Sequence, residues 1–170
     1  MCSTCNSGSS DDFISSKLAG DKLFDGLSEA NLDAIKSVMR SEHFGEGSLI
    51  FQEGETPRGV FMLNEGKVKL AFRSGKRKTR VVRIAEAGDF LGLSATIAGE
   101  VYEVSAETIT PCRTAFITRN EFLSLLRDQP EFCFRVAQLL GQYIHESYEN
   151  FRLLGRGRSA AARLVRLIFG

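Results

Sequence analysis

The chain has 170 residues, of which 43% are hydrophobic and 25% are charged, and its formal net charge at pH 7 is +1. These values exclude a disordered chain, and they exclude an overall charge that attracts nucleic acid or an anionic membrane. No apolar run is long enough to span a bilayer, and MCSTCNSGSSDDF at the N-terminus lacks the regions of a secretory signal. We therefore expect a cytoplasmic protein without membrane contact.

The N-terminal part of the chain predicts a flexible tail followed by helices. Residues 1–12 are rich in Ser, Gly and Asp, a composition typical of a tail. From Phe13 to Arg40 apolar residues recur at helical spacing, which predicts two short helices. Ser28 is the expected N-cap of the second helix, because its hydroxyl can accept a hydrogen bond from a free backbone N–H group.

From Phe44 to Thr118 the hydrophobic period changes to two, which is the period of β-strands. Glycines separate the runs, and RSGKRK between two of them predicts a hairpin tip. The stretch GDFLGLSA predicts a turn followed by a short apolar helix. Strands are predicted in SLIFQEG, GVFMLNEGKVKLAF, TRVVRIA, EVSAETIT and RTAFIT. Short strands with regular turns, flanked by helices, indicate an α+β fold built around a jelly roll, or double-stranded β-helix.

Helical spacing returns in the C-terminal third of the chain. NEFLSLLRDQP predicts a helix with Asn120 as its N-cap, and a longer helix is expected from about Glu131 to about Leu154. Residues of the longer helix alternate spacings of three and four, which predicts a coiled-coil seam and a homodimer. The residues of this predicted seam are Ala137, Leu140, Ile144, Ser147, Phe151 and Leu154. Packing of the same stripe on the β-domain of its own chain is the alternative.

The order and spacing of these elements resemble the Crp/Fnr family of bacterial transcription regulators over residues 21–170. The resemblance rests on LFDGLSEANLDAI, GEGSLIFQEGETPRGVFMLNEGKVKL, GDFLGLSA, QPEFCFRVAQLLGQYIHESYENFRLL and SAAARLVRLIF. It implies a sensor domain of the cyclic-nucleotide-binding type at 13–128, after the tail, and a dimerisation helix at 129–155. Residues 156–170 would begin a DNA-binding domain whose helix-turn-helix is absent from the chain. Promoter DNA and RNA polymerase are then partners of the full-length protein.

The resemblance also implies an effector site. The residues that it assigns to this site are Gly88, Asp89, Phe90, Leu91, Gly92, Glu100, Val101, Ser147 and Tyr148. Gly88 and Asp89 align with the Gly-Glu pair of cyclic nucleotide binders, whose carboxylate accepts a ribose hydroxyl. Ser147 and Tyr148 align with a Thr-Ser pair that contacts adenine, so half of that pair is lost.

The decisive departure from the family pattern is at the phosphate. Glu100 and Val101 align with the Arg and Ser that hold the cyclic phosphate. At a separation of about 4 Å and an effective dielectric constant near 20, each unit of charge changes the energy by roughly 4 kcal/mol. We therefore expect that cyclic AMP and cyclic GMP are not the ligand, and the cofactor or effector stays unknown.

Cysteines offer a second sensing hypothesis. Cys2 and Cys5 resemble part of the N-terminal cluster that holds an iron-sulfur group in some family members, and Cys112 lies in the β-region. Cys112 is three residues from the aligned ligand position, Ala115, so its thiol should point to the opposite face of the strand. Three interpretations of Cys2 and Cys5 remain open: two exposed thiols in a tail, a redox switch, or a metal site. Cys133 is expected in the core.

Catalytic motifs are absent from the sequence, and its two histidines are too few for a cupin-type metal centre. We therefore predict no catalytic residues and no enzyme activity. The basic run RSGKRKTRVVR is either a solvated hairpin or a contact for DNA phosphates or an acidic partner. The overall prediction is an effector-sensing and dimerisation module of a Crp/Fnr-type regulator. The alternative is a stand-alone sensor or scaffold that does not bind DNA.

Overall fold

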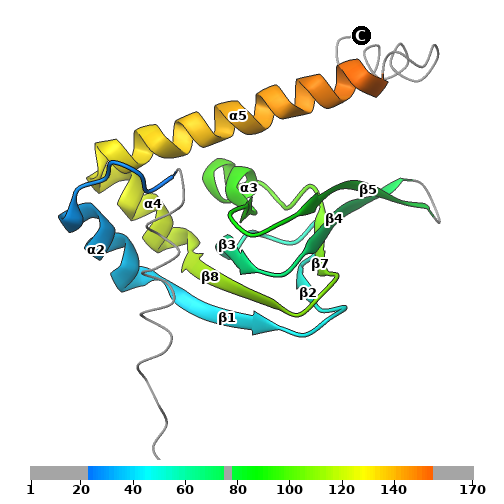
Figure 1. Ribbon diagram of the computed structural model, residues 1–170, viewed down its shortest axis with the longest axis horizontal. Coiled ribbons are helices and arrows are strands. Elements are labelled where there is room, and N and C mark those ends of the chain that lie inside the picture. The colour runs from blue at the N-terminus through cyan, green and yellow to red at the C-terminus, as the bar shows by residue number, and fades with distance from the viewer. Residues whose placement is uncertain (1–22, 75–77, 155–170) are drawn as a thin grey trace, which may run out of the picture. The chain divides into compact units, whose positions relative to one another are not determined.

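The computed structural model describes residues 23–74 and 78–154, which form two four-stranded antiparallel sheets and four helices (Figure 1). The chain divides into a unit that ends at Cys133 and a unit that begins at Phe134. Several predictions lie outside the described residues: the tail, the first helix, Cys2, Cys5, the hairpin tip and the start of a DNA-binding domain. The jelly-roll fold is confirmed.

The first described helix is α2, Glu29–Val38, and it begins where the sequence predicts. Ser28 is extended, and its hydroxyl accepts a hydrogen bond from the backbone N–H of Asn31 at 3.3 Å. Ile35 is the buried residue of this helix. The N-cap prediction for Ser28 is therefore confirmed.

Two sheets make the roll, and the chain crosses between them after every strand except β4, which is followed by its neighbour β5 in the same sheet. The strands of the first sheet, in spatial order, are β1 (Arg40–Phe44), β8 (Cys112–Thr118), β3 (Gly59–Glu65) and β6 (Phe90–Leu91). Those of the second are β2 (Leu49–Phe51), β7 (Ser105–Thr108), β4 (Val68–Ser74) and β5 (Lys78–Ala85). All pairs are antiparallel. Both β1 and β6 escape the sequence prediction, β1 because RSEHF is mostly polar and β6 because it has two residues.

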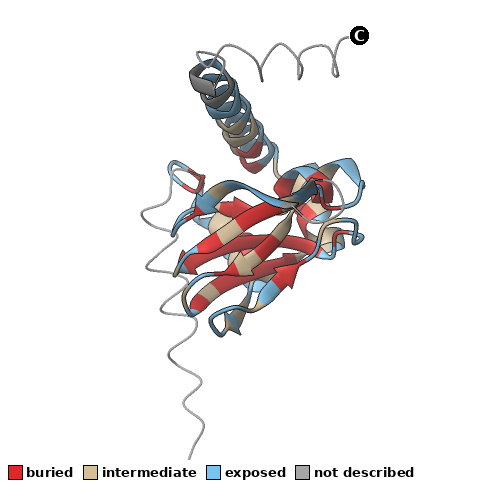
Figure 2. Cartoon of the chain, turned by 90° about the vertical axis from the view of Figure 1, so that its right-hand side faces the viewer, coloured by how far each residue is buried: buried red, intermediate tan, exposed pale blue. Residues whose placement is uncertain are grey.

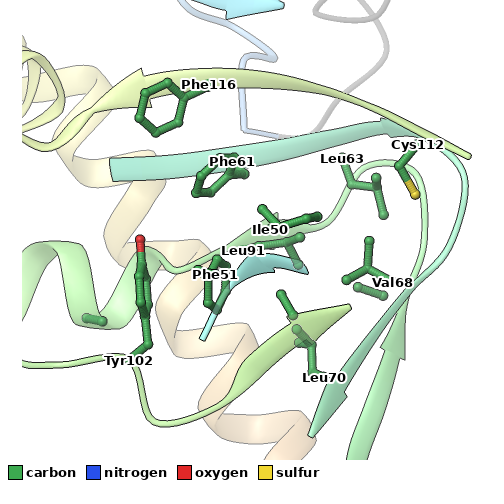
Figure 3. Close-up of a cluster of buried hydrophobic side chains, with 13 residues drawn as sticks. Ile50, Phe51, Phe61, Leu63, Val68, Leu70, Leu91, Tyr102, Cys112 and Phe116 are labelled. Carbon is green, nitrogen blue, oxygen red and sulfur yellow. The ribbon is translucent and has the colours of Figure 1, made fainter. Parts of the chain in front are cut away.

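An apolar core fills the space between the sheets. Figure 2 shows that buried residues gather along the strands, and Figure 3 shows the cluster from close by. The rings of Phe51 and Tyr102 stack with centroids 4.0 Å apart, and Phe61 lies 4.7 Å from Phe116. Aromatic pairs at these distances add packing energy beyond the burial of their area. The core therefore joins β2, β3 and β8 to the segment that precedes β7.

A second group of aromatic side chains joins the first sheet to helices. Phe24 lies 6.1 Å from Phe90 of β6 and 6.4 Å from Phe132, measured between ring centroids. Phe122 of helix α4 (Arg119–Asp128) meets Phe132 edge to face. Strand β3 carries buried residues on both of its faces and lies between β8 and β6 in the first sheet.

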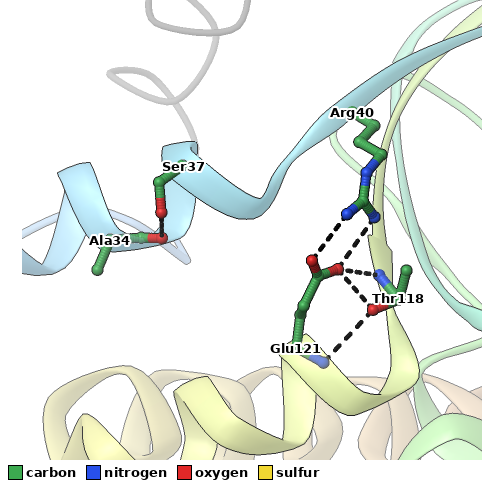
Figure 4. A network of polar contacts seen from close by, with 5 residues as sticks. All are labelled: Ala34, Ser37, Arg40, Thr118 and Glu121. Carbon is green, nitrogen blue, oxygen red and sulfur yellow. Dashed lines mark hydrogen bonds and ion pairs between the residues drawn. The ribbon is translucent and has the colours of Figure 1, made fainter.

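Helix α4 begins one residue after Thr118, not at the predicted cap Asn120. Thr118 is extended and accepts from the N–H of Glu121, while the Glu121 carboxylate accepts from the N–H of Thr118. This reciprocal capping box satisfies two backbone donors at once, which Asn120, already inside the first turn, cannot do. Arg40 of β1 donates to both carboxylate oxygens of Glu121, at 3.0 and 2.8 Å (Figure 4).

The Glu121 contacts predict a specific pH dependence of stability. Hydrogen bonds from Arg40 and then from Thr118 lower the pKa of Glu121. Its stabilising contribution is therefore complete above the unfolded-state pKa, about 4.3, and is lost as the pH falls through the lower folded-state pKa. We expect Glu121→Gln to be less stable than wild type at pH 7, with the difference shrinking below about pH 4.

Urea unfolding at a series of pH values measures this difference. The control is Glu146→Gln, which removes an exposed carboxylate from the long helix α5 (Pro130–Leu154). Its curve should run parallel to that of the wild type. A Glu121→Gln curve that is also parallel to the wild type would contradict the prediction.

Helix α5 confirms the predicted long helix to within one residue at its start. Its predicted seam residues Ala137, Ile144 and Ser147 are exposed on this chain, and Leu140 is half-buried. The side chains of Phe151 and Leu154 lie outside the described residues. None of the helices described here combines the length and apolar character needed to cross a membrane.

Candidate effector site

The predicted site begins with a tight turn between β5 and β6. The carboxylate of Asp89 accepts a hydrogen bond from the backbone N–H of Glu86 and an ion-paired hydrogen bond from Arg83, both at 2.8 Å. The backbone of Gly88 and Asp89 is bonded to Leu63 of β3. The carboxylate that the resemblance assigns to a ribose hydroxyl thus already has two donors, one from its own turn and one from β5.

Arg83 is a neighbour of the site that the sequence analysis missed. It lies on β5 opposite Leu70, two residues before the buried Ala85. Side chains two residues apart share a face of a strand, so this alternation was the available signal. Residues 88–109 contain no Lys or Arg, and the guanidinium of Arg83 comes from the preceding strand. The turn therefore carries a positive charge as well as a negative one.

We call residues 88–101, which include the contiguous part of the predicted effector site, the cassette. The middle of the cassette is held by its apolar side chains. Phe90 and Leu91 are buried in β6, so their side chains belong to the core. Gly92 caps the short helix α3 (Leu93–Ala98) with a φ of 74°. A Cβ on Gly92 would lie 2.8 Å from the ring of Tyr102. Glycine is therefore required here for both its conformation and its size.

Tyr102 is the second residue that the sequence analysis passed over. Its side chain is 2% exposed, its hydroxyl donates to the Gly59 carbonyl at 3.3 Å, and it accepts from the Arg58 N–H at 3.2 Å. Burial raises the pKa of Tyr102. Its ring lies between Gly92 and Phe51, and it stacks on the Phe51 ring.

Glu100 and Val101 lie on the exposed segment between α3 and β7. Because Glu100 is exposed to water, it repels a phosphate less strongly than the sequence alone predicts. In water, two unit charges about 4 Å apart interact with about 1 kcal/mol, and dissolved salt weakens this further. The missing arginine, more than the added carboxylate, separates this segment from the family pattern.

The remaining predicted effector residues lie on α5. Ser147 donates its hydroxyl hydrogen to the Tyr143 carbonyl of the preceding turn, at 2.8 Å. The side chain of Tyr148 is 64% exposed. Both belong to the unit that begins at Phe134, whereas the cassette belongs to the unit that ends at Cys133.

The two described cysteines differ in environment. Cys112 is buried in the core, where its thiol donates to the Thr110 and Lys67 carbonyls at 3.1 and 3.5 Å. Burial raises the pKa of this thiol, which lowers the thiolate fraction that metal binding and oxidation need. Cys133 is exposed, so its predicted place in the core is wrong: it lies on the solvent side of the first turn of α5. Among the described residues, no group of three or more His, Cys, Asp or Glu side chains could hold a metal.

Comparison with known proteins matches residues 41–129 to the cyclic nucleotide-binding domain family. The chain is 24% identical over 133 residues to a CRP-like cAMP-activated global transcriptional regulator of Mycobacterium tuberculosis, covering 78% of this chain and 59% of that protein. It is 29% identical over 108 residues to the cGMP-dependent protein kinase egl-4 of Caenorhabditis briggsae, covering 62% of this chain and 14% of the kinase.

A solved structure agrees with the match. The fold is similar to that of a cyclic nucleotide-binding domain from Methylobacillus flagellatus, with a TM-score of 0.73, 21% identity and coverage of 88% of this chain and 85% of that one. The chain spans less than two thirds of the length of the two curated relatives above. The sequence resemblance is thus confirmed: this chain belongs to the cyclic nucleotide-binding domain family, and its homologues include regulators of the Crp/Fnr type.

Proposed function

We propose that the chain is the effector-sensing and dimerisation part of a cytoplasmic transcription regulator of the Crp/Fnr type, without catalytic activity. The observation that carries the proposal is the exposed apolar face of α5, the long helix that follows the jelly roll in the chain. A lone helix with such a face exposes hydrophobic area to water, and pairing with a second copy removes it. Contacts with promoter DNA and RNA polymerase would belong to the full-length protein.

The exposed side chains of α5 refine the predicted seam. Phe134, Ile144 and Tyr148 are 63%, 57% and 64% exposed. Phe134, Gly141 and Tyr148 are spaced by seven, and so are Ala137 and Ile144, which together make the a and d positions of a heptad pattern. Gly141 has open space around it, which would let a second helix approach closely. The refined seam keeps Ala137 and Ile144 and replaces Leu140 and Ser147.

Three features favour an effector other than cyclic AMP or cyclic GMP. The carboxylate of Asp89 is already bonded to Arg83 and to the turn. The buried ring of Tyr102 packs directly against Gly92 of the cassette. Glu100 stands in place of the arginine that pairs with the phosphate. The residues of this cassette therefore do not fit a cyclic phosphate.

The seam predicts that the protein is a dimer and that one charged residue introduced into the seam weakens the association of its two chains. We expect Ile144→Glu to raise the dimer dissociation constant at least about 100-fold, because the carboxylate would be buried without a partner. Sedimentation equilibrium measures the constant. The matched control is Gln142→Glu, which adds the same charge on an exposed position next to the seam and should change the constant by less than about threefold.

Two results would count against the proposal. A wild-type chain that is monomeric at all accessible concentrations would remove the dimerisation part. A dimer constant that changes on addition of cyclic AMP or cyclic GMP would overturn the effector class, and we expect no change with either nucleotide.

A further inference from the structure

The C-terminal end of the cassette helix α3 is held by an arginine from another element. This helix has no basic residue in its last turn. Instead, Arg119, the first residue of α4, donates its Nε–H to the Thr96 carbonyl of α3 at 3.0 Å. The carbonyls at a helix C-terminus lack partners within the helix and carry a partial negative charge, so a guanidinium there is favourable.

Gly99 makes room for this contact. It is the C-cap of α3, with a φ of 75°, and a Cβ at this position would lie 2.8 Å from a terminal nitrogen of Arg119. The left-handed backbone and the lack of a side chain both favour glycine here. The guanidinium therefore lies directly against the end of α3, immediately before Glu100.

Both partners of the contact are anchored at the N-terminal end of β3. The hydroxyl of Thr96 is fully buried and donates to the Gly59 carbonyl at 2.9 Å. The backbone N–H of Arg119 donates to the Arg58 carbonyl at 2.9 Å. On its other side, α4 is fixed by the capping box and by the bidentate pair of Arg40 with Glu121. The Arg119 side chain adds a direct link between two helices that are otherwise joined through the start of β3.

We propose that Arg119 is a positioning residue that couples α3 to α4, so that a displacement of the cassette helix is passed to the start of the C-terminal helices. A hydrogen bond with a charged donor is strong and directional, which suits the transfer of a displacement between two short helices. As a signalling step this coupling rests on the proposed sensor function. As a link between two helices it stands without it and needs no effector to be measured.

Hydrogen exchange followed by mass spectrometry on the full chain tests the coupling. Glu121→Gln loosens the N-terminus of α4, and with Arg119 in place we expect it to raise exchange in peptides covering 93–99 by roughly fivefold. In an Arg119→Met background the same substitution should change exchange in those peptides by less than about twofold, because the bridge is gone. Arg119→Lys keeps the charge and one donor, and should restore part of the transfer.

The control is Arg127→Met, which removes an exposed cation from the last turn of α4 and should leave the transfer intact. If the two substitutions raise exchange in α3 independently, so that their effects multiply, Arg119 is only a local stabiliser and the proposal is overturned. Sedimentation of the same variants separates the two proposals. If the chain is a dimer but α3 and α4 are not coupled through Arg119, the proposed function stands and the coupling proposal is overturned. If the helices are coupled in a chain that is a monomer, the coupling proposal stands and the dimerisation part of the proposed function is overturned.

Discussion

We expect Gly59→Ala to lower the free energy of unfolding by about 3 kcal/mol, because the first residue of β3 has no room for a methyl group. An added Cβ would overlap the backbone carbonyl of Ile117 in β8 and lie 2.7 Å from the Phe116 ring. Backbone in the middle of a sheet cannot move aside without breaking its ladder, and β3 pairs with β8 from this residue onward. The Gly59 carbonyl also accepts from Thr96 and Tyr102, so a shift would disturb the cassette.

Urea unfolding followed by circular dichroism measures this loss. The matched control is Gly45→Ala, whose Cβ would meet Ser48 Oγ at an ordinary 3.7 Å and should change stability by no more than about 0.5 kcal/mol. Equal stability of the two variants would show that β3 and β8 do not approach as closely as described.

Tyr102→Ala should cost about 4 kcal/mol, which is typical of the loss of a large buried aromatic ring. The ring stacks on Phe51, touches Gly92 and is almost completely buried, so its removal leaves a cavity in the core (Figure 3). Tyr102→Phe keeps the ring and removes only the hydroxyl, which leaves the Arg58 N–H without its acceptor. We expect that variant to cost about 1 kcal/mol.

The comparison of these two variants separates packing from hydrogen bonding, and chemical unfolding at pH 7 provides both numbers. A loss below about 1 kcal/mol for Tyr102→Ala would contradict the placement of this ring in the core. A loss of equal size in both variants would mean that the hydroxyl, and not the ring, holds the cassette to β3.

Local patterns in the sequence were sufficient for most elements of the fold. Ser28 has a capping side chain directly before a helical pattern, and the structure uses it as the cap. Apolar residues of β3, β4 and β8 face a core that the sequence predicts without knowledge of their partners. The prediction of Asn120 as the N-cap of α4 was wrong because two residues that can cap a helix lie close together. The structure uses Thr118, since only Thr118 forms a capping box with Glu121. The sequence did not predict strand β1, because its pairing with β8 comes from backbone hydrogen bonds that polar residues make equally well.

The sequence by itself therefore determined the jelly roll and the long helix, because these depend on spacing and residue type along the chain. Only the tertiary structure showed that Arg83 contacts Asp89, that the ring of Tyr102 lies against Gly92, and that Arg119 contacts the end of α3. Arg119 lies 23 residues from its partner Thr96 in the chain. Contacts of this kind depend on how strands cross between two sheets, and no local period encodes which side chains meet there.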